Sequence, residues 1–189
     1  LPDLAIDGNL AYEFSADTLN QGEEMNLSVG VSNISNQNIG ATRAQFRMQG
    51  QGQQSEEWEL DLPPLSAGEN FTLTTSKATA SWNGSTQLSL NINPADSPTE
   101  RLRINNQAVK DFIIVGDDIV PVVDVTFDGQ QILDGDLVAA SPLIQMSITD
   151  ENQYLLLADT NLFVVVVHDP LGNEQTLALT SPEVQFSPA

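Results

Sequence analysis

Paired acidic residues are the side chains in this 189-residue sequence whose type and spacing best fit a chemical task. Asp117 and Asp118 are adjacent, and Asp150 and Glu151 precede Asn152 in one polar segment. Ca²⁺ takes about six to eight oxygen ligands, most of them carboxylates and carbonyls. We therefore predict calcium binding, with Asp117 and Asp118 as one pair of candidate ligands and Asp150 and Glu151 as another, and no other cofactor. The alternative is that these acids form turns, because Asp and Asn tolerate left-handed backbone and close Asx turns.

Two further acidic patterns carry less information about chemistry. Asp134-Gly135-Asp136 is a third cluster, but none of the clusters has the spacing of an EF-hand loop. Glu23-Glu24 and Glu56-Glu57 fit exposed strand edges, and nothing selects two carboxylates at the fixed separation that a glycosidase needs.

The single histidine, His168, also gives no support for a hydrolase. This residue follows the Val-rich run 162–167 and precedes an Asp-Pro turn, which is typical of an exposed strand end. No Gly-x-Ser-x-Gly elbow accompanies it. We expect no enzymatic activity in this chain.

The two tryptophans are the candidates for stacking on a sugar. Trp58 alternates with Leu60 and Leu62, which predicts a core position. Trp82 precedes the turn signal Asn83-Gly84, and we predict that it is an exposed ligand contact.

Charge and composition exclude several functions. The chain has 6 basic and 26 acidic residues, a formal net charge of −20, and no cysteine. Nucleic-acid binding needs clustered Lys and Arg, so it is excluded. No apolar run approaches the roughly 20 residues that span a bilayer, so we expect no membrane insertion. The lack of cysteine excludes disulfides and thiol catalysis.

Alternating apolar residues in the first part of the chain predict strands that would position these side chains. Such runs cover 25–31, 43–48, 58–62, 71–73, 88–92 and 109–115, with a first strand at 4–6 or at 10–14. Gly, Pro and Asn separate them, and no helical period is present. Strands that are apolar on one face predict two antiparallel sheets packed as an immunoglobulin-like β-sandwich.

A change of composition divides the chain. Residues 1–116 carry 6 basic and 14 acidic residues, a net of −8, whereas residues 117–189 carry 12 acids and no Lys or Arg. We predict a domain boundary between Gly116 and Asp117.

The second part of the chain also has patterns that predict strands, at 123–127, 144–148, 162–167, 177–179 and 184–186, with a hairpin signal at Asp128-Gly129. With 73 residues against the usual ~100, it would be a short or truncated immunoglobulin-like domain. The fold class is therefore all-β, with two such domains in tandem.

Several short marks, in order, resemble the CARDB family. They are Pro2–Ile6, the corner Val31-Ser32-Asn33, the turn Leu65–Glu69, and Glu100 followed by Asn105-Asn106. Ser35 stands where the family usually has Gly, and Arg103 where it commonly has a second acid. The resemblance implies an immunoglobulin-like module of bacterial surface and secreted proteins over residues 1–116.

The second part resembles modules that follow CARDB-type repeats in large surface proteins of Bacteroidetes, through the run Pro121–Gly129 and through residues 154–157. Some of those parents carry a gingipain-like peptidase and use type IX secretion. The resemblance implies a non-catalytic spacer, adhesion or interaction pair at the outer cell surface. Its expected partners are a surface protein or glycan and the neighbouring domains of a longer chain. The alternative is a carbohydrate-binding or accessory module of a secreted enzyme.

Overall fold

In the computed structural model the protein is all-β. The residues described are 1–10, 12–155, 163–168, 171–182 and 184–187, and they contain thirteen strands and two short 3₁₀ turns. The chain divides into two compact units, unit 1 (Leu1–Asp118) and unit 2 (Ile119–Ala189). The boundary predicted from the sequence lies two residues before this division.

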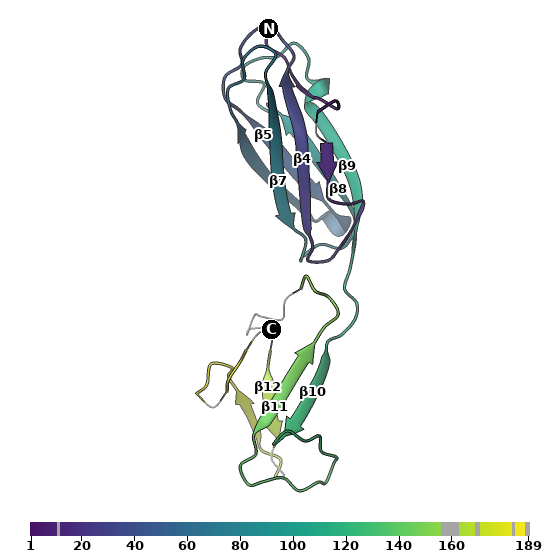
Figure 1. Ribbon diagram of the computed structural model, residues 1–189, viewed down its shortest axis with the longest axis vertical. Coiled ribbons are helices and arrows are strands. Elements are labelled where there is room, and N and C mark those ends of the chain that lie inside the picture. Colours follow the sequence, from purple (N-terminus) through teal and green to yellow (C-terminus); the bar gives the residue numbers. More distant parts are fainter. Residues whose placement is uncertain (11, 156–162, 169–170, 183, 188–189) are drawn as a thin grey trace. The chain divides into compact units, whose positions relative to one another are not determined.

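Unit 1 is a sandwich of two sheets (Figure 1). In the β4 sheet, β4 (Glu24–Asn33) pairs with β7 (Asn70–Ala78) along one edge. Its other edge pairs with β1 (Leu4–Ile6) and then with β2 (Tyr12–Phe14). The β8 sheet has the order β3-β9-β8-β5-β6. Its strands are β3 (Thr18–Asn20), β9 (Gln107–Val115), β8 (Gly84–Ile92), β5 (Thr42–Gln49) and β6 (Ser55–Leu62).

The alternation in the sequence decides which side chains fill the space between the sheets. Successive side chains of a strand point to opposite faces, so every second residue is buried. The buried set includes Met25, Leu27, Val29 and Val31 of β4, Ala44, Phe46 and Met48 of β5, and Leu88, Leu90 and Ile92 of β8. Burial of this apolar surface is the main stabilising contribution, at about 25 cal/mol per Å². The predicted β-sandwich is thereby confirmed for unit 1.

The N-terminal strands differ from the prediction in number. Both of the alternative first strands form, as β1 and β2, and a third strand, β3, follows them. β3 pairs with β9 in parallel, whereas the other strand pairs of unit 1 in the described chain are antiparallel.

On each side of the sandwich, the edges of the two sheets meet at a lateral seam. At each seam a lysine lies over an aromatic ring. At the β6–β7 seam, Lys77 forms an ion pair with Glu56, and its Nζ lies 5.3 Å from the centroid of a Trp58 ring. At the opposite seam, Lys110 pairs with Asp17, and its Nζ lies 5.5 Å from the Phe14 ring centroid. The hydrogen bond from Lys110 to Asp17 raises the pKa of the Lys110 ammonium above its ordinary value of 10.5.

Unit 2 contains two antiparallel strand pairs in its described part. β10 (Val122–Phe127) pairs with β11 (Ile144–Thr149), and β12 (Val165–His168) pairs with β13 (Glu174–Leu177). The buried hydrophobic residues of the described chain all lie in unit 1. An immunoglobulin-like sandwich in residues 117–189 therefore stays a prediction. The strand predicted at 184–186 is wrong, because residues 184–187 form no strand.

The hairpin signal in unit 2 forms its turn but does not join the expected strands. Asp128 and Gly129 have φ values of +51° and +80°, as the signal requires. The turn closes only a bridge from Phe127 to Gln130, and the partner of β10 is β11, which begins at Ile144. The signal specified the local backbone and not the pairing. No helix in the described residues is long and apolar enough to cross a membrane.

Candidate functional site

A buried carboxylate organises the end of unit 1 at which residues 1–4 lie. Glu100 is 6% exposed. Its Oε2 accepts the backbone N–H of Leu4 at 2.6 Å, and its Oε1 accepts the side-chain amides of Asn93 at 2.6 Å and Asn106 at 2.9 Å. The ion pairs of the described residues do not include it. Amide donors thus compensate the desolvation of this carboxylate, as a buried charge requires.

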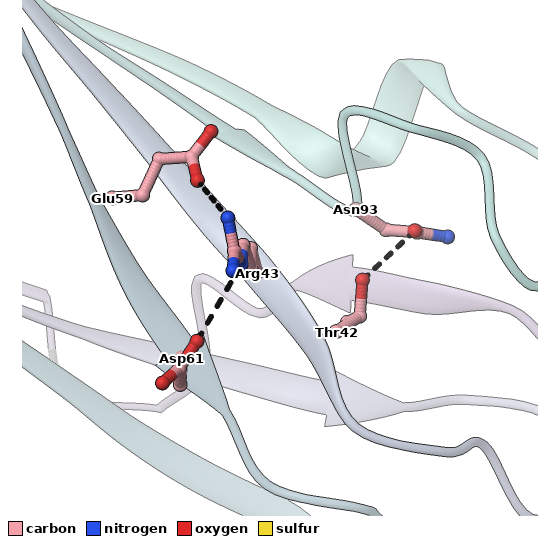
Figure 2. A network of polar contacts seen from close by, with 5 residues as sticks. All are labelled: Thr42, Arg43, Glu59, Asp61 and Asn93. Atoms are coloured by element: carbon pink, nitrogen blue, oxygen red, sulfur yellow. Dashed lines mark hydrogen bonds and ion pairs between the residues drawn. The ribbon is translucent and has the colours of Figure 1, made fainter.

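The two asparagines link Glu100 to the C-terminal end of β8. Asn93 follows β8, and its Oδ1 accepts the hydroxyl of Thr42 at 2.9 Å (Figure 2). Asn106 donates a second bond to the carbonyl of Ile92. The Oδ1 atoms of Asn105 and Asn106 are buried and have no protein donor. These two oxygens can still accept a hydrogen bond, for which an ordered water is the usual donor at a buried polar position.

A second network holds the loops beside this cluster. The amide of Asn33 contacts the carbonyls of Gln37, Leu65 and Ser66 at 2.8–3.1 Å. Its Oδ1 accepts the backbone N–H and the hydroxyl of Ser35. Gly68, with φ of +74°, donates its N–H to the carbonyl of Asn33. The corner and turn marks seen in the sequence are therefore in contact with each other, and their role is to fix loops.

Cross-strand ion pairs cover the outer face of the β8 sheet. Arg43 contacts Glu59 at 2.7 Å and Asp61 at 3.6 Å (Figure 2), and Arg47 contacts Glu57 at 3.5 Å. These side chains are largely exposed, so each pair contributes about 0–1 kcal/mol. They neutralise part of the acidic edge strand β6.

The predicted calcium ligands divide between the two units. Asp117 and Asp118 end unit 1, where the N–H of Asp117 donates to Gln21 Oε1 at 3.0 Å. Asp150 and Glu151 belong to unit 2, where Asp150 Oδ1 accepts the N–H of Asn152 at 2.8 Å. That last bond is the geometry of an Asx turn. Calcium binding by these four acids stays a prediction.

The third acidic cluster forms a turn. Asp136 Oδ2 accepts the N–H of Leu133, the Asp136 N–H donates back to the Leu133 carbonyl, and Gly135 has φ of +88°. His168 ends β12 opposite Glu174 and is exposed. The Asp-Pro pair that follows it, residues 169–170, lies outside the described residues.

The predicted ligand contact at Trp82 is wrong. Trp82 is 2% exposed and belongs to the core of unit 1. A Cβ added at Gly50 would lie 3.1 Å from its ring, so the tip of the β5–β6 hairpin lies against the indole and covers it. The turn that follows Trp82 suggested that its side chain is exposed, but Gly50, 32 residues earlier, lies against the ring.

The core position predicted for Trp58 is confirmed only in part. It stacks on Phe46 with ring centroids 5.3 Å apart, and its Nε1 donates to Thr75 Oγ1 at 3.0 Å. The residue is half-buried at the β6–β7 seam and packs against the core from there.

A shallow hollow of about 560 Å³ lies on the β4 sheet, over parts of β2, β4 and β7. Its lining combines polar side chains with two apolar ones, and consists of Glu13, Ser15, Asn26, Ser28, Thr74, Thr75 and Ser76 together with Phe14 and Leu27. The sequence did not reveal this surface, because its residues come from segments that lie far apart along the chain.

Residues 1–110 match the CARDB family profile. The chain belongs to the CARDB family. CARDB domains are non-catalytic modules with an immunoglobulin-like β-sandwich fold, in agreement with unit 1. Glu100, Asn105, Asn106 and the Asn33 corner, on which the resemblance rested, are the residues that build the two networks at one end of this CARDB domain.

Solved structures similar to the chain include two of the CARDB domain of the PF1109 protein from Pyrococcus furiosus. The crystal structure, described as a complex with di-metal ions, is 18% identical, with a TM-score of 0.45, and the match covers 60% of this chain and 89% of that one. The solution structure is 19% identical, with a TM-score of 0.46 and coverage of 61% and 96%. A β-glucosidase from Listeria innocua in complex with glucose is 16% identical, with a TM-score of 0.43 over 61% of this chain and 16% of the enzyme. No curated protein matches the sequence.

Proposed function

We propose that the chain is a spacer and interaction segment of a larger exported cell-surface protein. One observation carries the proposal: the chain enters the CARDB domain at one end and leaves it at the other (Figure 1). At the entry end, the carbonyl of Pro2 accepts the N–H of Arg101. At the exit end, Gln21 accepts the N–H of Asp117 and donates to the carbonyl of Ala80.

The last strand connects these two ends. β9 has nine residues, and at roughly 3.3 Å per residue it extends about 30 Å. A module with its connections at opposite ends adds this length to a chain of domains, which is what a spacer must do. Its partners would be neighbouring domains of the parent chain and a protein or glycan on a cell surface.

The test is exposure on the source cells. An antibody against this chain should bind intact cells, and protease added outside should remove the epitope. A cytoplasmic β-sandwich protein from the same cells is the control for lysis. Protection of the epitope until the cells are broken would contradict the proposal.

A second candidate function is carbohydrate binding at the hollow on the β4 sheet, and the hydroxyl and amide lining favours it. Ser28 and Thr74 both line the hollow and lie opposite each other on β4 and β7, so Ser28→Val with Thr74→Val should abolish binding in a glycan array. Trp82→Phe, which alters only the core, is the matched control. An array with no bound glycan would contradict this second candidate and leave the spacer proposal standing.

A further inference from the structure

In unit 1, the edge strand β3 and the last strand, β9, form a parallel pair. Thr18 lies opposite Ile113, and Asn20 lies opposite Val115. β9 ends at Val115, directly before the exit at Gly116-Asp117. We infer that the CARDB domain is a load-bearing module that resists tension applied between its two ends. This inference rests on the proposed spacer role, because only a domain in series with others carries such tension.

The direction of the load follows from the topology. Residues before β3 come from the entry end of unit 1, and residues after β9 continue to the exit end. Tension therefore pulls β3 toward the entry end and β9 toward the exit end, so that the strands must slide past each other along their own axes. Parallel pairs have evenly spaced hydrogen bonds. Under sliding these bonds are loaded together, whereas under peeling they break one after another at a lower force.

The contacts at this pair are well placed to oppose sliding. Ile113 donates its N–H to the carbonyl of Asp17 at 2.9 Å, and Gln21 donates its N–H to the carbonyl of Val115 at 2.8 Å. The Asp117 N–H to Gln21 Oε1 bond extends the pairing beyond the end of β9. Lys110 on β9 also forms an ion pair with Asp17, the residue directly before β3.

The segment before β3 adds to the resistance. β1 and β2 run along β4 and lie on the load path before β3. The Glu100 carboxylate holds the N–H of Leu4 at 2.6 Å, which anchors β1 at the entry end. Leu4 and Leu19 are each 1% exposed, so displacement of β1 or β3 brings buried apolar side chains into water.

Single-molecule force spectroscopy can test the inference directly, because the chain has no cysteine and engineered cysteines are unique attachment points. Handles on Leu1→Cys and Asp118→Cys load unit 1 from end to end and leave unit 2 outside the load path. Handles on Gly40→Cys and Pro63→Cys flank the paired ends of β5 and β6 and peel that hairpin instead. Both positions are exposed, and a Cβ at Gly40 meets nothing within 4 Å. Complete unfolding between the first pair of handles is identified by a release of about 3.3–3.6 Å per residue.

We expect an end-to-end unfolding force several times the peeling force. An end-to-end force equal to or below the peeling force would overturn the inference, and this comparison needs no destabilised variant. In the end-to-end handles, Gln21→Pro removes the N–H that bonds Val115 and should lower the force toward the peeling value. Trp58→Phe removes a hydrogen bond to Thr75 at the opposite seam, so it should lower equilibrium stability without changing the force. A force equally sensitive to both substitutions would also contradict the load path.

The two proposals fail separately. Surface exposure with low end-to-end resistance would refute the load-bearing inference alone. High resistance in a protein that external protease never reaches would refute the surface placement alone.

Discussion

Removal of the Glu100 carboxylate should be among the most damaging single changes in unit 1. Glu100→Ala leaves three buried donors without this acceptor, and a buried donor left unsatisfied costs about 1–3 kcal/mol. The N–H of Leu4 loses its partner completely. Asn93 and Asn106 each keep a second acceptor, the carbonyls of Pro98 and Ile92, so each loses one of two bonds. One full penalty and two partial ones predict a loss of about 3–5 kcal/mol.

Urea unfolding followed by tryptophan fluorescence measures this loss, provided that the dependence on urea concentration is unchanged. Glu100→Gln keeps the size and one acceptor oxygen but turns an N–H₂ group toward a donor, so it should cost about 1.5–3 kcal/mol. Glu13→Ala, at an exposed carboxylate of β2, is the matched control and should stay within about 0.5 kcal/mol.

Amide exchange supplies an independent measure. The Leu4 N–H should lose protection in Glu100→Ala while amides in the centre of β8 keep theirs. A loss of stability below about 1 kcal/mol, or unchanged protection at Leu4, would show that the carboxylate is not what holds β1 in place.

Three further predictions follow from the contacts described. Trp82→Ala should cost about 3–5 kcal/mol in urea unfolding because the ring is buried, and a cost below about 1 kcal/mol would return Trp82 to the surface. The raised pKa of Lys110 means that its pairing with Asp17 is fully present below pH 10.5 and is lost as pH rises through the higher folded-state pKa, so thermal scans above pH 10.5 should show a decline that Lys110→Met lacks. If Asp117, Asp118, Asp150 and Glu151 bind calcium, the melting temperature should rise with calcium concentration, and changing all four acids to Asn or Gln should remove the rise; the same melting temperature in calcium and in sodium chloride of equal ionic strength would contradict the calcium prediction.

The regular strands of unit 1 could be predicted because their physics is local. Each of β4, β5, β6 and β8 places apolar residues at every second position, and that pattern alone assigns a buried face. β3 escaped prediction because it has three residues and one apolar side chain, Leu19. It is a strand because β9 provides its partner 95 residues later along the chain, and no local pattern contains that information.

The side-chain networks show the same limit. Glu100 could be singled out by resemblance, but its partner Leu4 lies 96 positions away, and only the folded chain shows that the pair is buried. Trp82 was misassigned because its cover comes from another hairpin. In unit 2, the Asp128-Gly129 turn was read correctly at the level of backbone angles and incorrectly at the level of pairing.

The lysines at the two seams also affect whether copies of this domain aggregate through their sheet edges. An incoming strand from a neighbouring molecule would need the outer backbone edge of β6 or β7, where the Lys77–Glu56 pair and the Trp58 ring stand in the way. At the other side it would meet Lys110, Asp17 and Phe14. Charged side chains at sheet edges are a common protection against edge-to-edge polymerisation. Copies of this domain should therefore stay individually dispersed at concentrations at which a sandwich with bare edges would form fibrils.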